Sequence, residues 1–360
     1  MKNTFGQSLS ITLFGESHGQ QIGAVLDGLR PGIAINEELI RRQLSLRRPF
    51  GKISTARVEA DEFSIVSGVF EGKTTGTPLC ILIPNTNTRS KDYAPSLPRP
   101  GHADYTAQCK YHGYQDYRGG GHFSGRITAA LVAAGAIVIS ALREKGIFIG
   151  THIASLADVA DRSFKDLKED VSTLNDRVFP VLSEEAAKNM QAAIEEAARD
   201  GDSVGGVLES VIIGLPAGLG EPWFDTVEGL LSHALFSIPA VKGVEFGDGF
   251  ALAKMRGSEA NDAMCIENGE VVTQSNHNGG INGGITNGMP VTFRCAIKPT
   301  PSIFQRQQTV DLQQMRNATL ELKGRHDPAI IHRARVVVDS VAALTVYDLL
   351  AQRYGTNLNF

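Results

Sequence analysis

Hydrophobic residues recur at helical spacing in four segments of the chain. Asn36 can cap the first of these helices, and Glu37 and Glu38 suit the positive end of its dipole. The second segment is rich in alanine and apolar nearly all round, so we expect it to be buried on most sides. Ser183 opens a third, amphipathic helix, which Gly201 ends. The predicted helices cover residues 36–46, 127–145, 183–199 and 339–354.

Apolar runs between these helices predict strands. They cover residues 11–14, 22–26, 58–69, 79–84, 205–215, 291–297 and 330–338. These strands do not alternate with helices, as the βαβ units of a parallel sheet would. We therefore predict an α+β fold with antiparallel sheets packed around buried helices. Residues 1–360 are expected to form a single domain, with room for a surface lobe at residues 151–200.

The composition is that of a globular protein, with 42% hydrophobic and 21% charged residues. A net charge of −4 argues against a general nucleic-acid binder, which would carry a basic surface. Basic residues instead form local clusters, such as Arg41-Arg42 and Arg47-Arg48. Local positive charge on a nearly neutral chain favours a small anionic ligand.

The four cysteines are Cys80, Cys109, Cys265 and Cys295. They show neither a Cys-x-x-Cys pair nor the spacing of a zinc site, so we predict reduced thiols and no bound metal. The first residues lack the pattern of a signal peptide, and the apolar run 129–142 is shorter than the ~20 residues that span a bilayer. We therefore expect a cytoplasmic protein.

The segment 99–126 concentrates residues that can carry chemistry. It contains three histidines, several arginines and the triple glycine 119–121, directly before the alanine-rich helix. Glycines allow the backbone to lie against a ligand, and a helix start offers free N–H groups to an anion. Arginines hold phosphate or carboxylate, and histidines exchange protons near neutral pH. The segment predicts an active site for a small anion.

Three glycine motifs resemble familiar sites without matching them fully. Gly15-Glu-Ser-His-Gly19 fits the nucleophile elbow of a hydrolase, but a strand rather than a helix is predicted after it. Gly68-Val-Phe-Glu-Gly-Lys73 is one residue short of a phosphate loop, so we predict a turn between two strands. The triple glycine lacks the third glycine of a dinucleotide-binding motif, because Ser124 takes its place.

Further motifs complete a set of side chains for acid–base chemistry on an anion. They supply anion-binding groups, proton carriers and a carboxylate, namely Arg48, Arg126, Lys298, Arg325, His18, His102 and Asp327. Such a set suits the removal of an anionic leaving group with proton transfer, and it requires no nucleophile. The residues alone leave the substrate and any cofactor open.

Nine motifs in the same order resemble the chorismate synthase family over nearly the whole chain. Among them are Gly15-Glu-Ser-His-Gly19, Arg99-Pro-Gly-His-Ala-Asp104, Ala240-Val-Lys-Gly-Val-Glu245, Lys298-Pro-Thr-Pro-Ser302 and Gly324-Arg-His-Asp-Pro328. The resemblance implies a lyase that eliminates phosphate and a ring hydrogen from 5-enolpyruvylshikimate 3-phosphate to give chorismate. It also implies a β-α-β sandwich, a homotetramer and reduced FMN. Because the chain has no added segment for a reductase, we expect an external flavin reductase to supply this FMN. The resemblance also associates FAD and NADP with the activity.

The resemblance also assigns roles by position. The catalytic residues would be His18, His102 and Asp327, and those that bind substrate would be Ser17, Arg48, Ser124, Arg126 and Arg325. The residues that bind the flavin would be Arg48, His122, Phe123, Ser124, Gly283, Lys298, Pro299, Thr300, Pro301, Ser302 and Arg325. By contrast, His112 is expected to be structural.

The chain departs from the family pattern at three of its positions. His122 stands where many members carry an arginine, Lys52 replaces a second arginine, and Pro239 replaces an asparagine. We expect these changes to tune affinity rather than chemistry. Two other functions remain open at this stage. One is a flavin-independent lyase or phosphatase acting on a phosphorylated sugar acid, and the other is a carrier of anions or flavin without enzymatic activity.

Overall fold

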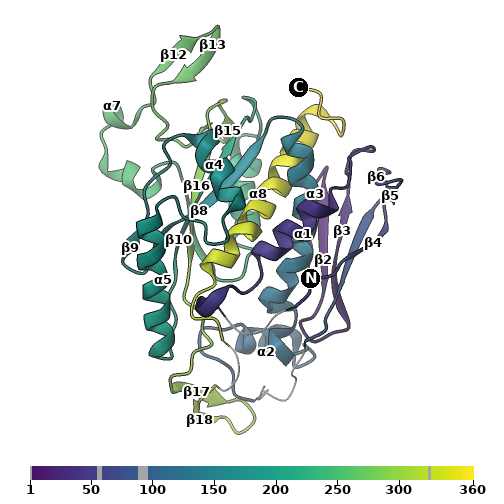
Figure 1. Cartoon of the computed structure of the whole chain (residues 1–360), viewed down its shortest axis with the longest axis vertical. Helices are drawn as coiled ribbons and strands as arrows, with labels where there is room; N and C mark the ends of the chain where they lie inside the picture. Colours follow the sequence, from purple (N-terminus) through teal and green to yellow (C-terminus); the bar gives the residue numbers. More distant parts are fainter. Residues whose placement is uncertain (1, 55–58, 88–95, 323–325) are drawn as a thin grey trace.

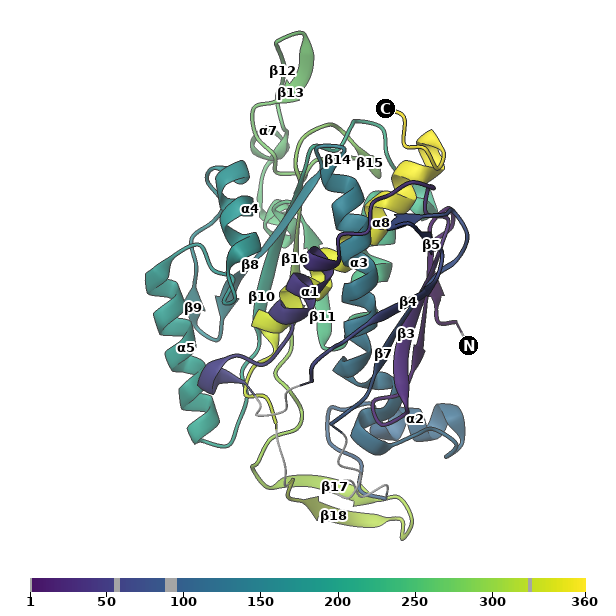
Figure 2. The same cartoon turned by 45° about the vertical axis from the view of Figure 1, so that its right-hand side comes forward.

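Two five-stranded antiparallel sheets enclose two long helices in the computed structural model (Figures 1 and 2). The structure describes residues 2–54, 59–87, 96–322 and 326–360. The first sheet has the order β1 (Thr4–Phe5), β2 (Ser10–Gly15), β3 (Gln21–Asp27), β7 (Leu79–Pro84) and β4 (Ser64–Ser67). The second has the order β11 (Val241–Phe246), β16 (Val291–Ile297), β10 (Gly206–Ile213), β8 (Phe148–Leu156) and β9 (Val159–Ala160).

Helices α3 (Thr128–Arg143) and α8 (Ile331–Tyr354) form the layer between the sheets. Helix α3 packs on β3 and β7, α8 packs on β8 and β10, and the two helices pack on each other. They approach closely at Gly135, where a Cβ atom would lie 2.3 Å from the Cβ of Ser340. This arrangement confirms the expected α+β sandwich of antiparallel sheets around buried helices.

The remaining helices surround this core. They are α1 (Glu37–Leu46), α2 (Asp104–Tyr111), α4 (Leu167–Asp176), α5 (Glu184–Arg199), α6 (Val227–Leu235) and α7 (Gly257–Ala260). Within β8, Gly150 lies against Val171 of α4, whereas Thr151 donates a hydrogen bond to Asp339 of α8. The second sheet therefore lies between α4 and α8.

Four two-stranded hairpins complete the fold. They are β5–β6 (Val69–Phe70, Lys73–Thr74), β12–β13 (Met264–Glu267, Glu270–Thr273), β14–β15 (Ile281–Asn282, Ile285–Thr286) and β17–β18 (Gln307–Asp311, Arg316–Leu320). Hairpins β12–β13 and β17–β18 project from opposite ends of the molecule (Figure 1). The β5–β6 hairpin confirms that the glycine motif at 68–73 is a turn and no phosphate loop.

Helix caps predicted from the sequence are present in the structure. The side chain of Asn36 accepts a hydrogen bond from the Leu39 amide at 2.9 Å, and Ser183 caps α5 in the same manner. Helix α3 lies within two residues of its predicted bounds. Strands β7 and β16 have their predicted bounds, and β10 lies within the predicted range. Of the described residues 59–69 in the strand predicted at 58–69, those of β4 and the first residue of β5 form strands, whereas residues 59–63 do not.

The strand predicted at residues 330–338 is wrong, because α8 begins at Ile331 and includes residues 331–338. The run is rich in valine and isoleucine, which favour strands when local preference decides. Here the segment is buried on nearly all sides between α3 and the second sheet. Its buried polar residues pair at helical spacing, with Arg335 3.3 Å from Asp339 one turn later. Burial and this pairing override the strand preference.

Residues 151–200, where the sequence leaves room for a surface lobe, begin inside the second sheet. Residues 151–156 belong to β8, and the remainder forms β9, α4 and α5 beside it. A buried histidine joins the two parts: His152 lies 2.9 Å from Asp161 and 2.9 Å from Glu209. Burial lowers the pKa of His152, but the two carboxylates outweigh it and raise the pKa above its usual value.

The start of the first sheet is held by a buried carboxylate of α8. Asp348 is 3% exposed and accepts hydrogen bonds from the backbone amides of Gln7, Ser8 and Leu9 at 2.7–3.2 Å. Gln352 donates a further bond at 3.0 Å. The carboxylate therefore fixes the entry to β2 against the central helix layer.

The helical stretch 125–143 is long and apolar enough to cross a membrane by length and composition alone. The prediction that no segment is long enough to cross a membrane rested on the apolar run 129–142. The helical stretch is longer than that run, so the argument from length does not hold. In the described structure 83% of an apolar 18-residue window of this stretch is buried, and its α3 portion packs between the two sheets. This is the position of a core helix.

Candidate active site

A cavity of about 980 Å³ opens where the loop 99–103, the turn 118–126 and the beginning of α8 meet. Polar and charged side chains line it together with apolar ones from α3, α6 and α8. Its charged and titratable lining residues include Arg47, Arg48, Glu59, Asp61, Arg99, His102, His122, Arg126, Lys298, His326, Asp327 and Arg333. The cavity thus gathers residues from widely separated parts of the chain at one place.

The backbone of the triple glycine packs against two histidine rings. Residues 119–121 have φ values of 60°, 80° and 54°, a region that favours glycine. A Cβ atom on Gly119 would lie 2.3 Å from the ring of His18 and 2.7 Å from Ser17 Oγ. A Cβ atom on Gly120 would lie 3.3 Å from the ring of His102. Glycine is therefore required here because the backbone packs directly against both rings.

Ser17 and His18 lie behind Gly119 rather than in the lining of the cavity. Ser17 is fully buried, and its Oγ has no hydrogen-bond partner within the described residues. The turn containing them leads into β3, so the motif 15–19 is no hydrolase elbow, which would lead into a helix.

His102 is held by a carboxylate and an arginine. Its Nδ1 lies 2.7 Å from Asp104 Oδ1. Arg99 donates from Nε and Nη2 to the two oxygens of Asp104, each at 2.8 Å. Burial raises the pKa of Asp104, but the hydrogen bonds from Arg99 and His102 outweigh it and hold the pKa well below its usual range. Asp104 is therefore ionised beside His102.

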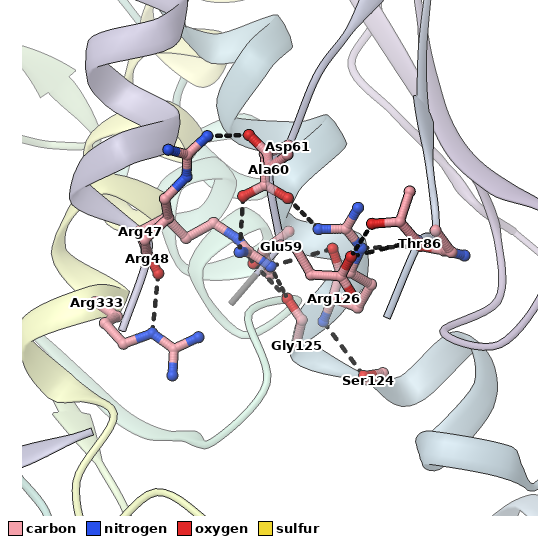
Figure 3. Close-up of polar contacts among 12 residues, drawn as sticks. Arg47, Arg48, Glu59, Ala60, Asp61, Thr86, Ser124, Gly125, Arg126 and Arg333 are labelled. Carbon is pink, nitrogen blue, oxygen red and sulfur yellow. Dashed lines mark hydrogen bonds and ion pairs between the residues drawn. The ribbon is translucent and has the colours of Figure 1, made fainter. Parts of the chain in front are cut away.

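Two arginines share a buried aspartate at the wall of the cavity (Figure 3). Asp61 forms ion pairs with Arg126 and, at 3.7 Å, with Arg47. Arg126 also donates to Asn85 Oδ1 at 2.9 Å and to the carbonyl of Pro84 at 3.1 Å. Its guanidinium is thus bound by protein acceptors through Nε and both terminal nitrogens. These contacts stabilise the wall of the cavity, and the predicted role of Arg126 in binding substrate stays a prediction.

The beginning of α8 connects a second carboxylate with the arginine loop. Arg333 lies 2.8 Å from both oxygens of Asp327. It also donates to the carbonyl of Arg47 at 2.9 Å (Figure 3). The neighbouring Arg48 donates to the carbonyl of Ala60. Arg333 therefore ties Asp327 to the loop that carries Arg48.

The segment 298–302 leaves the end of β16 and borders the cavity. Lys298 Nζ donates to the carbonyl of Gly101, and Thr300 donates to the carbonyl of Asp327 at 2.6 Å. Ser302 Oγ accepts from Arg99 Nη1 at 3.2 Å. The segment joins the His102 loop to the Asp327 loop.

His122 is fixed by a backbone contact. Its Nδ1 lies 2.8 Å from the carbonyl oxygen of Gly15. A carbonyl can only accept, so Nδ1 carries the proton that forms this hydrogen bond. This hydrogen bond holds the His122 side chain against the turn formed by residues 15–19.

Most of the site residues expected from the sequence meet at the cavity. Those that line it are Arg48, His102, His122, Phe123, Ser124, Arg126, Lys298, Thr300, Pro301, Ser302 and Asp327. Ser17, His18, Pro299 and Gly283 lie outside its lining, and Gly283 is in the turn of the β14–β15 hairpin. Arg325 falls outside the residues that the structure describes.

Several contributors were missed by the sequence analysis. Glu59, Asp61 and Arg333 lack a motif that marks them. Asp104 lies in the motif 99–104 but was given no role there. Ala240 has a φ of 76°, unusual for a residue with a side chain, and it lines the cavity beside Pro239. The replacement at Pro239 was the signal that could have pointed to this wall. His112, with a φ of 55°, ends α2 as its cap.

Comparison with known proteins identifies the family of this chain. The family model described as chorismate synthase matches residues 9–351. The chain belongs to the chorismate synthase family. Chorismate synthase of Pyrococcus abyssi is 48% identical over 351 residues, which cover 97% of each chain. That of Lachnoclostridium phytofermentans is 47% identical over 362 residues, covering 99% of this chain and 97% of the relative.

A solved chorismate synthase has a similar structure, with a TM-score of 0.76 and 29% sequence identity. The match covers 97% of this chain and 94% of that one. The resemblance carried by the sequence motifs is therefore confirmed, and the chain is an enzyme of the chorismate synthase family. The roles given to individual residues remain predictions.

Proposed function

We propose that this protein converts 5-enolpyruvylshikimate 3-phosphate into chorismate, with reduced FMN bound beside the substrate. The C–O bond to phosphate and one ring C–H bond break, and a carbon–carbon double bond forms. The hydrogen leaves as a proton, so substrate and product stand at the same oxidation level. The observation that carries the proposal is the meeting of the His102–Asp104 pair, Asp327 and several cationic side chains at one cavity.

The residues around the cavity fit a flavin. Gly101 and Gly119 lack side chains, and Ile238 and Pro239 add apolar walls against which a flat ring can lie. The Lys298 ammonium and the Arg48 guanidinium are donors suited to a phosphate group. When bound, reduced FMN supplies electron density that helps to expel phosphate and regains it within the same turnover. On this proposal the segment 298–302 and residues 122–124 hold the flavin.

The chain's own residues act on charge and protons. His102 gives a proton to the departing phosphate, because it is the histidine at the cavity that a carboxylate orients. Arg48 and Lys298 stabilise the negative charge that develops on the leaving group. Asp327, held by Arg333, assists removal of the ring proton. His18 and Ser17 lie behind Gly119, where they can support the flavin side of the site.

The test is anaerobic incubation of the purified protein with the substrate and dithionite-reduced FMN. Chorismate, followed by its ultraviolet absorbance, and inorganic phosphate are expected in equal amounts. Formation of phosphate without flavin would instead favour a flavin-independent lyase or phosphatase. Binding of flavin or substrate with no turnover would leave only a carrier function.

A matched pair of variants tests the role of His102. His102→Asn should lower kcat by about 10²-fold or more, the usual contribution of general acid catalysis. His112→Asn replaces a histidine ten positions further on, at a left-handed position that asparagine tolerates, and should leave kcat within about 2-fold. Equal kcat values for the two variants would contradict the assignment.

We also propose that the protein works in the cytoplasm as a homotetramer and receives reduced FMN from a separate reductase. Light scattering of the purified protein would give a mass four times that of the chain. Turnover with oxidised FMN and NADPH should require an added flavin reductase. Turnover without that reductase would contradict the dependence.

A further inference from the structure

Asp104 lies between an arginine and the histidine of the cavity. Its Oδ1 is 2.7 Å from His102 Nδ1 and accepts from Arg99 Nη2 at 2.8 Å. Its Oδ2 accepts from the backbone amide of Arg99 at 3.0 Å and from Arg99 Nε at 2.8 Å. Both oxygens are therefore committed, one to a pair of Arg99 donors and the other to Arg99 and His102. Arg99 Nη2 also lies 3.1 Å from His102 Nδ1, but it is closer to Asp104 Oδ1, at 2.8 Å, and Nδ1 itself is closer to that oxygen, at 2.7 Å.

The position of one proton follows from these contacts. Two atoms that can both accept do not approach to 2.7 Å without a proton between them. Arg99 neutralises the carboxylate, and Asp104 also lies in the first turn of α2, where a negative charge is favoured. The pKa of Asp104 lies well below its usual range. The carboxylate thus carries no proton, and the shared proton belongs to Nδ1 of His102.

The Cε1–Nε2 edge of the His102 ring faces a glycine. A Cβ atom on Gly120 would lie 3.3 Å from Cε1 and 3.5 Å from Nε2 of His102. With glycine at this position, no side chain covers that edge from the turn. Because Nδ1 is committed to Asp104, Nε2 is the ring atom that can exchange a proton with a ligand.

We propose that Asp104, held by Arg99, is a positioning residue that fixes the Nδ1–H tautomer of His102 and so makes Nε2 the atom that transfers the proton. This inference rests on the proposed function for its catalytic part. The tautomer itself can be measured without any turnover. The proposal goes beyond the role of His102 alone, because it gives the Arg99–Asp104 ion pair a function in catalysis.

The substitution Asp104→Asn has a predictable effect on the tautomer. Asparagine offers one acceptor oxygen and one NH₂ group. If its NH₂ took the place of Oδ2, it would meet two Arg99 donors, the amide and Nε, whereas in the place of Oδ1 it would meet one, Nη2. The oxygen therefore stays there, and the NH₂ turns toward His102. An NH₂ donor requires an unprotonated Nδ1, so the neutral ring would switch to the Nε2–H tautomer.

The experiment combines nitrogen-15 NMR of histidine-labelled protein with steady-state kinetics. The signals of His102 are assigned by their loss in His102→Asn. Neutral His102 should carry its proton on Nδ1 in the wild-type protein and on Nε2 in Asp104→Asn. The kcat of Asp104→Asn should fall by about 10²-fold or more, as expected for a wrong tautomer, with KM changed less than about 3-fold.

Asp116→Asn is the matched control. Arg118 binds Asp116 in nearly the same way, with its backbone amide at 3.0 Å, Nε at 2.9 Å and Nη2 at 2.8 Å. This variant removes a comparable ion pair in the same segment, and it should keep the His102 tautomer and kcat within about 3-fold of wild type.

The wild-type spectrum alone can overturn the proposal. A neutral His102 with its proton on Nε2 in the unmodified protein would do so, whether or not Asp104→Asn folds. An unchanged tautomer in Asp104→Asn, or a loss of kcat no larger than in Asp116→Asn, would also overturn it. If the wild-type protein shows the expected tautomer but forms no chorismate, the proposed function fails while the positioning of the ring stands.

Discussion

Replacing Asp61 by asparagine should destabilise the wall of the cavity by a calculable amount. The Asp61 side chain is fully buried, and those of Arg126 and Arg47 are 2% and 9% exposed. Without the carboxylate, two buried guanidiniums face each other with no counter-charge from residue 61. Asparagine tolerates the left-handed backbone of residue 61, which has a φ of 52°, so the substitution changes mainly the charge.

Removing one partner of a buried ion pair costs about 3–5 kcal/mol. The entropy of unfolding is about 2.1 cal/mol/K per residue, which gives about 0.8 kcal/mol/K for 360 residues. The melting temperature should therefore fall by about 4–7 °C, measured by differential scanning calorimetry.

Glu62→Gln provides the control for this measurement. Glu62 is the next residue, and its ion pair with Arg41 is exposed, with side-chain exposures of 68% and 53%. Exposed pairs contribute little, so its melting temperature should stay within about 1 °C of wild type. A melting temperature of Asp61→Asn equal to that of Glu62→Gln would refute the reasoning that the buried triad stabilises the site.

Three further substitutions test other parts of the structure. Asp348→Ala leaves three backbone amides at the start of β2 without their acceptor and should lower the free energy of unfolding in urea by about 3 kcal/mol or more; a loss below about 1 kcal/mol would contradict this. His152→Gln should destabilise the protein most near pH 6 and progressively less toward pH 9, because a raised pKa in the folded state gives stability that is lost as the pH rises through it; a difference that grows with pH would be the wrong sign. Gly119→Ala places a Cβ 2.3 Å from the His18 ring at a φ of 60° and should lower kcat by roughly 10-fold or more, whereas near-normal kcat would show that the turn can move aside.

Local signals in the sequence were sufficient for several elements of the fold. Asn36 and Ser183 mark helix starts through their own side chains, and β16 is a short apolar run between turn residues. The first two turns of α8 could not be recognised in this way. Their valines favour a strand locally, and only packing against α3 and the second sheet makes them helical.

The candidate site was predictable where its residues belong to compact motifs. His102 and Lys298 lie in such motifs, and both line the cavity. Asp61 was not predictable, because its partner Arg126 is 65 positions away and the pair forms only when the first sheet and α3 are assembled. Arg333 was not predictable for another reason. Its segment was interpreted as a strand, and this interpretation gave no indication that the Arg333 side chain reaches Asp327.

The central claim is elimination with reduced flavin and no net redox change. The measurement that tests it most directly is anaerobic turnover with one equivalent of reduced FMN per chain and a large excess of substrate. We expect many molecules of chorismate and of phosphate per flavin, with the flavin spectrum at the end identical to that at the start. At most one chorismate per flavin, accompanied by oxidation of the flavin, would contradict the account.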